Sequence, residues 1–153
     1  NCWDVSAITD MSYLFSMKST MDENIGCWDV SNVTQMDYMF HGASSFNQDI
    51  GKWKVSKVES MTAMFYLASS FNQDISSWNT RKVKDFSYMF NGASKFKQNL
   101  CDWFNNFQSN GSPLAHSMLT YSGCIFQVDP SFASKEHFCQ KCEPPDERRG
   151  MFF

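Results

Sequence analysis

The chain has 153 residues, with 13 Lys and Arg against 16 Asp and Glu, for a formal net charge of −3 at pH 7. Both signs are interspersed along the sequence, so we expect neither the broad basic surface of a nucleic-acid-binding protein nor a nucleic-acid partner. No apolar run approaches the roughly 20 residues of a membrane-spanning helix, and direct membrane insertion is therefore not expected.

Tryptophan recurs every 25 residues, and its neighbours recur with it. The positions are Trp3, Trp28, Trp53, Trp78 and Trp103. A fixed period of this length is typical of proteins built from stacked structural repeats, in which each coil contacts only its neighbours. The sequence therefore predicts a repeat solenoid over residues 1–123, with one coil starting at each tryptophan, and a cysteine-containing C-terminal cap and tail over residues 124–153.

The first half of each repeat predicts a short helix. Within 31–43, the apolar residues Val33, Met36, Phe40 and Ala43 fall at helical spacing, as does Met39. Ser31 precedes them at the position of a helix N-cap, and Gly42 stands where a glycine can end a helix.

The second half, 46–53, predicts a brief extended rung with a kink near Gly51. Equivalent rungs of successive coils would pair as a parallel ladder about 4.8 Å apart and close one shared apolar interior. The expected fold class is thus α/β, a right-handed leucine-rich-repeat-like solenoid of about five coils. The side chains expected inside it are Phe40, Phe46, Phe65, Phe71, Phe90 and Trp53.

The repeat changes after the fourth coil. Met118 lies 15 residues beyond its tryptophan, whereas Met89 lies 11 residues beyond, which indicates about four inserted residues centred on 110–113. From Cys124 onward the repeat is absent. That segment is interpreted as a disulfide-tied cap followed by a tail.

Six cysteines and two glycosylation sequons favour an oxidising compartment, either secreted or at the cell surface. The candidate glycosylation sites are Asn32 and Asn110. Cys2 and Cys27 are 25 residues apart, so stacked coils would bring their Cα atoms within the roughly 4.4–6.8 Å that a disulfide needs.

The other four cysteines, Cys101, Cys124, Cys139 and Cys142, allow three pairings. The repeat register separates Cys101 from Cys124, and a Cys139–Cys142 bridge would close only a small ring. We therefore expect each of the first two to pair with one of the last two, which would fold the tail over the open end of the coils. Zinc held by these four thiolates is the alternative.

The sequence carries no catalytic motif. His41, His116 and His137 share no pattern with a nucleophile, so we expect neither an enzyme nor a cofactor or resident metal. Asp49 and Asp74 occupy equivalent positions and are interpreted as acceptors for turn amides, with a calcium ion between them as the alternative. The amides at Asn47, Asn72, Gln48 and Gln73 are interpreted as structural ladders.

The strings WDVSNVTQMDYMF and ASSFNQDI, the second present in Ala43–Ile50 and again in Ala68–Ile75, resemble the 25-residue repeat of the BspA-like leucine-rich-repeat surface proteins. The resemblance spans roughly Trp3 to Asp102. The ending, with Cys139-x-x-Cys142, is similar to the last coil and cap of members from algae and other protists. Phenylalanine and methionine replace most of the leucines.

The resemblance implies a leucine-rich-repeat-like solenoid, an extracellular or cell-surface location, and adhesion or protein binding without catalysis. The expected partner is a protein, with a glycan as the alternative. A structural scaffold subunit within a larger complex or matrix is the alternative. Partner choice would depend on exposed variable positions, which include Asp29, Lys54, Asn79, Asn32, Lys57 and Lys82.

Overall fold

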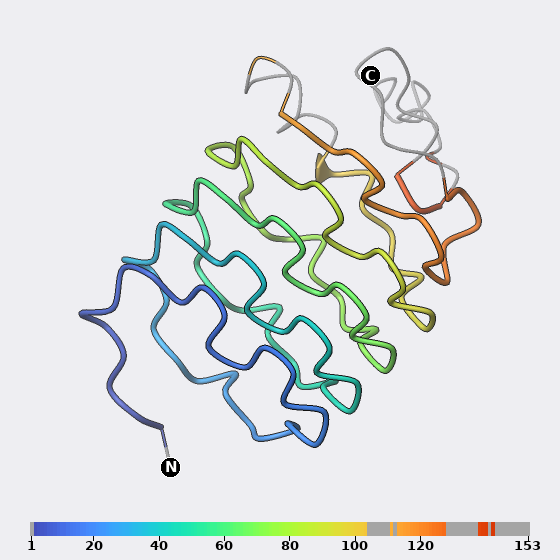
Figure 1. Ribbon diagram of the computed structural model, residues 1–153. Coiled ribbons are helices and arrows are strands. Elements are labelled where there is room, and N and C mark those ends of the chain that lie inside the picture. The colour runs from blue at the N-terminus through green and yellow to red at the C-terminus, as the bar shows by residue number, and fades with distance from the viewer. Residues whose placement is uncertain (1, 104–110, 112, 128–137, 141, 143–153) are drawn as a thin grey trace, which may run out of the picture.

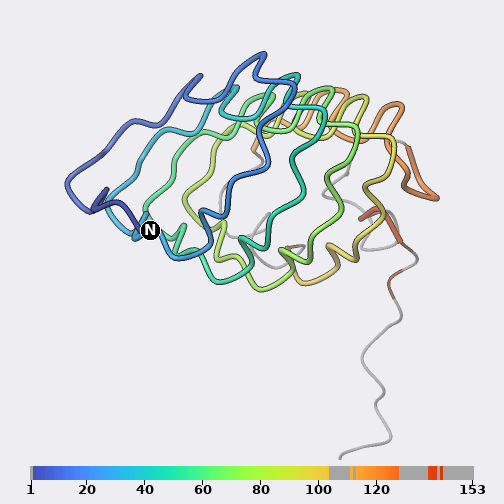
Figure 2. The same ribbon diagram turned by 90° about the horizontal axis from the view of Figure 1, so that it is seen from below.

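The computed structural model describes residues 2–103, 111, 113–127, 138–140 and 142. The chain forms coils stacked along one axis, with the first coil (blue) and the last described coil (orange) at opposite ends of the stack (Figures 1 and 2). Parallel β-bridges join residues 25 positions apart, from Asp10 to Gln35, from Gln35 to Ser60 and from Ser60 to Asp85. A fourth bridge, from Asp85 to Leu114, adds the fifth coil.

The α/β fold class predicted from the sequence is wrong. Within the described residues only Trp103 is helical, and extended pairing is limited to the four parallel bridges and an antiparallel one between Phe138 and Gln140. Turns and irregular segments make up nearly all of each coil. The expected right-handed solenoid, with a helix and a rung in every coil, is therefore not the structure of this chain.

Two consecutive turns stand where the helix was predicted. The N–H of Met39 donates to the carbonyl of Met36, and the N–H of Ala43 donates to that of Phe40. The third residue of each turn is left-handed, with φ of 56° at Tyr38 and 66° at Gly42. Type II turns require a positive φ at this position, and a right-handed helix cannot continue through it.

The remaining amides of this segment reach the next coil. In the second coil, the N–H groups of Met36, Tyr38, Phe40 and Gly42 donate to the carbonyls of Ser60, Thr62, Met64 and Tyr66 over 2.8–3.1 Å. An α-helix would use these N–H groups within its own segment. Stacking and helix formation therefore compete for the same donors. The turns still direct Met36, Met39, Phe40 and Ala43 inward, which explains their helix-like spacing.

The second half of the coil is joined to its neighbours by side chains. In the described structure, segments 46–52 and 71–77 share no backbone-to-backbone hydrogen bond, so the predicted parallel ladder is absent. Instead, the N–H of Asn72 donates to Asn47 Oδ1 over 2.9 Å, and Gln73 Nε2 donates to the carbonyl of Asn47 over 2.8 Å. These amides are structural, as interpreted from the sequence.

The interior consists of aromatic columns. Phe65 stacks on Phe40 and Phe90, with ring centroids 5.5 and 5.6 Å apart, and on Phe71 of its own coil at 3.9 Å. A tryptophan column runs beside it, and Trp53 Nε1 donates to the carbonyl of Ile25 over 3.2 Å. All six side chains expected inside are buried.

The fifth coil lies four residues out of the 25-residue register. Asp85 bridges Leu114 at an offset of 29 residues, whereas the preceding bridges have an offset of 25. The N–H groups of Phe86, Tyr88 and Phe90 still donate to this coil. Of the segment where the insertion was expected, only Gly111 and Pro113 are among the described residues. The register shift confirms the insertion length inferred from the sequence.

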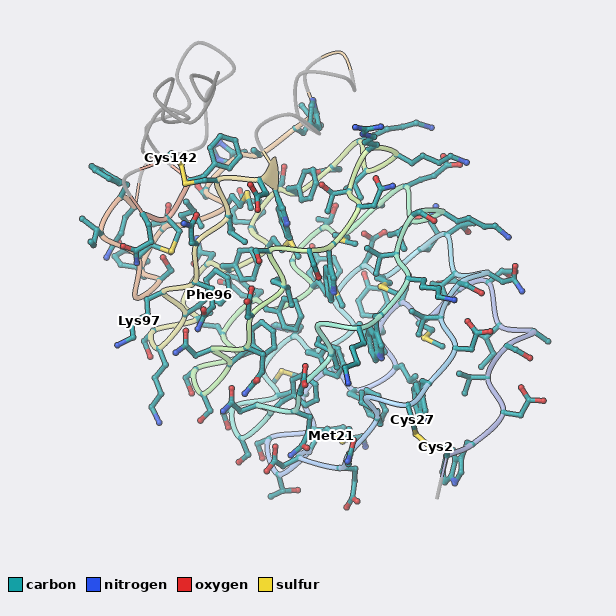
Figure 3. The ribbon with its side chains drawn as sticks, turned by 180° about the vertical axis from the view of Figure 1, so that it is seen from behind. Cys2, Met21, Cys27, Phe96, Lys97 and Cys142 are labelled. Carbon is teal, nitrogen blue, oxygen red and sulfur yellow. A yellow bond between two sulfur atoms is a disulfide. The ribbon has the colours of Figure 1, made fainter. Side chains whose placement is uncertain are left out.

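Disulfides close both ends of the stack (Figure 3). Cys2 pairs with Cys27 at the amino-terminal end, with a Cα–Cα distance of 6.0 Å. At the other end, Cys101 pairs with Cys142 and Cys124 pairs with Cys139. These are pairs of the kind expected from the repeat register. Because all four thiols form bridges, they do not make up the alternative zinc site.

The tail reproduces part of the fifth coil. Phe138 is fully buried, and its carbonyl accepts a hydrogen bond from the N–H of Leu100. Gln140 Nε2 donates to the carbonyl of Lys97 over 2.8 Å, just as Gln98 Nε2 donates to the carbonyl of Asn72. The sequence Phe138-Cys139-Gln140 therefore stands where the fifth coil would have its Phe-Asn-Gln segment. The rest of the predicted cap, residues 128–137, 141 and 143–153, lies outside the described residues.

Replacing Phe65 by alanine should lower the free energy of unfolding by about 3–5 kcal/mol, because the ring is fully buried within the phenylalanine columns. Urea unfolding of the oxidised protein, followed by tryptophan fluorescence, measures this. Lys54→Ala, at an exposed position, is the control and should change stability by less than about 0.5 kcal/mol. A loss below about 1 kcal/mol for Phe65→Ala would contradict the stacked interior.

Peptide mapping under non-reducing conditions should recover Cys101 crosslinked to Cys142, and Cys124 crosslinked to Cys139. The same digest should contain the Cys2–Cys27 pair. A Cys101–Cys124 crosslink, or four free thiols in the tail and last coil, would be inconsistent with the folded-back tail.

Candidate binding surface

Histidine and carboxylate groups do not assemble into a metal site. In the part of the chain that the structure describes, no group of three or more His, Cys, Asp or Glu side chains could hold a metal ion. His41 Nδ1 lies 3.1 Å from Ser16 Oγ, a contact between adjacent coils that the sequence analysis did not anticipate. His116 stacks edge-on against Tyr88 at a centroid distance of 5.4 Å. His137 lies outside the described residues.

Asp49 and Asp74 bind backbone amides. Asp49 Oδ1 accepts the N–H of Gly51 over 3.0 Å, and Asp74 Oδ1 accepts that of Ser76 over 2.9 Å. Asn24 and Asn99 accept the same bond at the equivalent positions of other coils. The Ser76 backbone and hydroxyl hydrogen bonds hold the pKa of Asp74 below its ordinary value. These carboxylates thus act as turn acceptors, as interpreted from the sequence.

The candidate glycosylation site Asn32 is exposed, although its amide is engaged. Its Nδ2 donates to the carbonyl of Ser6 over 2.9 Å, and its Oδ1 accepts Lys57 Nζ over 2.7 Å. Ser31, expected to cap a helix, donates its N–H to Asp29 Oδ1. The second site, Asn110, lies outside the described residues. All six variable positions singled out in the sequence are exposed.

A row of aromatic side chains lies on the outer surface of the turns. We call it the tyrosine stripe, and its members are Tyr13, Tyr38, Tyr66, Tyr88, His41 and His116. The rings of Tyr13 and Tyr38 stack at 4.9 Å, and those of His41 and Tyr66 lie 5.3 Å apart. Tyr66 packs edge-on against Tyr88. The stripe therefore runs continuously across the stack.

Three of the four tyrosines of the stripe occupy positions that disfavour them. Tyr13, Tyr38 and Tyr88 are the left-handed residues of their turns, with φ of 61°, 56° and 59°. A residue with a side chain is strained by about 1–2 kcal/mol in this conformation, whereas glycine is not. Tyr13 is 59% exposed and Tyr88 is 38% exposed, so their burial does not offset this cost fully. Unfavourable backbone conformations that persist in this way are enriched at functional sites.

In the third coil, Ala63 occupies the left-handed turn position that a tyrosine takes in the first, second and fourth coils, and Tyr66 keeps the ring contacts continuous. The space left by the smaller side chain forms a depression of about 250 Å³ lined by Tyr38, Ala63, Tyr66 and Tyr88. Ala63 is buried at its floor, with φ of 52°. Aromatic walls around a small residue can accept an apolar or planar group from a partner.

A second row flanks the stripe four residues later in each coil. Met17 and Leu67 are exposed there, and they alternate with Gly42 and Gly92. A Cβ atom at Gly42 would lie 2.8 Å from Met17 Sδ, and one at Gly92 would lie 2.5 Å from Leu67 Cδ2. The large side chain of one coil therefore lies across the glycine of the next. This packing adds exposed apolar area beside the stripe.

Sequence reasoning missed the tyrosine stripe, although a signal was present. Tyr13, Tyr38 and Tyr88 each stand two residues after an apolar residue that recurs in every repeat. These apolar residues are Met11, Met36 and Phe86. The expected helix put these tyrosines on a polar face of no special shape. Only the turn geometry shows that they share one left-handed position and one row.

Stacked turn-built coils, closed by disulfides and carrying an exposed aromatic row, define a disulfide-bonded repeat protein. The family described as "Mycoplasma protein of unknown function, DUF285" matches residues 1–103, and the chain belongs to this family. Searches of curated proteins and of solved structures found no match. Within the described residues, no helix is long and apolar enough to cross a membrane. Three disulfides indicate an oxidising environment.

Asp74→Ala should lower the free energy of unfolding by about 1 kcal/mol, because the Ser76 N–H loses its acceptor. Asp74→Asn is the matched control and should be close to wild type at pH 7, since Asn24 and Asn99 perform the same role. Chemical denaturation at pH 7 compares the three proteins. Equal losses for both variants would contradict the turn-acceptor role.

The same pair of variants tests the pH dependence. The pKa of Asp74 is lower in the folded protein than its ordinary value of 3.8, so the folded state binds fewer protons there than the unfolded state. The stabilisation is present above pH 3.8 and is lost as the pH falls through the folded pKa. Asp74→Asn should therefore show a smaller loss of stability than wild type between pH 5 and pH 2 in parallel denaturation curves.

Proposed function

We propose that this protein is a non-catalytic binding module of a secreted or cell-surface protein of the BspA-like type, and that it holds a protein partner on the tyrosine stripe. The observation that supports this most directly is the placement of Tyr13, Tyr38 and Tyr88 at left-handed turn positions. Glycine would satisfy these turns at lower cost. Tyrosine is among the residues that contribute most to protein–protein binding energy.

The shape of the stripe supports a partner that inserts a side chain. The depression over Ala63 offers aromatic walls from Tyr38, Tyr66 and Tyr88. Exposed Met17 and Leu67 extend the apolar surface beside it. A central apolar anchor surrounded by amphipathic residues is the usual anatomy of a protein-binding site.

A structural scaffold role is the second candidate. Trp3 at the amino-terminal end is 73% exposed. It lines a depression of about 420 Å³ with Phe15, Met21 and Trp28. Another subunit could stack on this apolar end. The two candidates differ in the surface used, so one set of variants separates them.

Replacing Tyr38 and Tyr88 together by glycine should weaken partner binding strongly while leaving the fold intact. Glycine removes the left-handed strain, which offsets the lost ring contacts, so stability should stay within about 1 kcal/mol of wild type. Loss of two aromatic anchors should weaken binding at least about thirtyfold, since one such anchor contributes about 2 kcal/mol. Quantitative capture from surface fractions of the source cells, followed by titration of the captured protein, provides the measurement.

Tyr121→Gly is the matched control. Tyr121 is left-handed, with φ of 55°, and 74% exposed, but it does not line the depression. It should bind like wild type. Equal binding by the Tyr38/Tyr88 variant would contradict the stripe as the binding surface. Loss of the complex only on Trp3→Ala would favour the scaffold role instead.

A further inference from the structure

The net charge of −3 conceals a strong separation of charge along the stack. Residues 1–50 contain seven acidic residues and one cation, Lys18, which gives −6. Residues 51–100 contain eight cations and three acidic residues, which gives +5. Residues 1–50 form the first two coils, and residues 51–100 form the next two. The negative and positive charges therefore lie mainly in different parts of the stack. The description of the two signs as interspersed along the sequence thus does not hold when the charges are counted over pairs of coils.

Five of these cations gather along one edge of the third and fourth coils, which we call the basic edge. Its members are Lys54, Lys57, Arg81, Lys82 and Lys84, and all are exposed. Arg81, Lys82 and Lys84 line a shallow depression of about 310 Å³ with Glu59. Lys57 and Lys82 are equivalent residues of adjacent coils. The edge therefore presents repeated positive charge at the spacing of the coils.

Glu59 neutralises only part of this charge. Lys84 Nζ lies 2.6 Å from Glu59 Oε2, and this hydrogen bond holds the pKa of Glu59 below its usual range. Acidic residues border the edge on both sides, and Asp102 lines a depression together with Arg81. Asp29 lies near Lys54 and Lys57. Hydrogen bonds from Ser31 make the largest contribution to its lowered pKa, and the positive charges of the two lysines lower the pKa further. A strip two coils wide thus keeps the positive charges of Lys54, Lys57 and Lys82 beyond the Lys84–Glu59 pair.

We propose that the basic edge binds an anionic polysaccharide that carries sulfate or carboxylate groups along its length. The cations are distributed along an open surface, which fits a ligand with several separate charges better than a single small anion. Ser76, Ser77 and Asn79 line an adjoining depression beside Arg81, where they can hydrogen-bond sugar hydroxyls.

Two further observations favour a polysaccharide over other polyanions. Trp78 is the one aromatic residue that lines either depression, and it is only 2% exposed, so these linings lack the exposed aromatic series on which single-stranded nucleic acids stack. The three disulfides indicate an oxidising environment, where acidic glycans of cell surfaces and matrices are available. The proposal does not depend on the tyrosine stripe, which comes from different positions of the coil.

Titration of the full chain with heparin, by isothermal calorimetry at 50 mM and 300 mM NaCl, tests the basic edge. Binding should be measurable at low salt and should weaken markedly at high salt, because exposed charges are screened. Replacing Lys54, Arg81 and Lys82 together by glutamine should weaken binding about tenfold at low salt. Lys57 and Lys84 are kept because their ammonium groups bond Asn32 and Glu59.

The matched control removes the same charge elsewhere, by replacing Lys18, Lys95 and Lys97 with glutamine. These residues are exposed and come from other positions of the coil. The control should bind heparin within about twofold of wild type. Equal weakening by both triple variants would overturn the proposal, because net charge alone would then explain binding. Thermal unfolding of each variant verifies that the fold is retained.

Three other results would also overturn it. One is an absence of heparin binding by the wild type at 50 mM NaCl. Another is equally tight binding of a short DNA duplex that depends on the same three residues. The third is salt-sensitive self-association in sedimentation that the edge variant abolishes, since the edge would then meet the acidic coils of a second copy. The Tyr38→Gly/Tyr88→Gly variant should keep its heparin binding, so a failure here is distinct from a failure of the stripe.

Discussion

The architecture depends on where alternate amides of the turn segment send their hydrogen bonds. In every coil from the first to the fourth, these N–H groups donate to the next coil, at distances of 2.7–3.1 Å. The amides between them close turns within their own coil. A left-handed residue at every fourth position makes this alternation possible, because it turns the chain and leaves these N–H groups available to the next coil. Stacking therefore replaces helix formation as the way in which the backbone is satisfied.

The aromatic interior follows from this backbone. Because each coil sits directly on the last, every buried side chain meets its own equivalent, and flat rings satisfy that condition by stacking. Phe65 contacts Phe40 and Phe90 at nearly identical distances, and Trp78 relates to Trp53 and Trp103 in the same way. The second half of the fourth coil still needs a neighbour, which Phe138 and Gln140 supply from the tail. The Cys101–Cys142 and Cys124–Cys139 disulfides hold this tail segment against the coil.

The repeat period alone was enough to predict the features that depend on which residues lie above one another. It located the buried rings, the register shift before Leu114 and the pairing of Cys2 with Cys27. It could not predict secondary structure, because tandem turns direct Met36, Phe40 and Ala43 inward at the spacing of a helix face. The tyrosine stripe and the basic edge were missed for a related reason. Both depend on which residues share an outward row, and that requires the turn geometry.

The same constraint separates scaffold from surface. Intercoil amides, inward rings and turn acceptors such as Asp74 fix the stack and leave the outward positions free to vary. Where an outward residue opposes the scaffold's own preference, as tyrosine does at a left-handed position, stability does not explain its presence. The basic edge is different, because exposed lysines cost the fold little and their clustering is visible only as charge. The aromatic row thus carries a backbone cost that the charged edge does not, and this difference is the reason why separate proposals are made for the two surfaces.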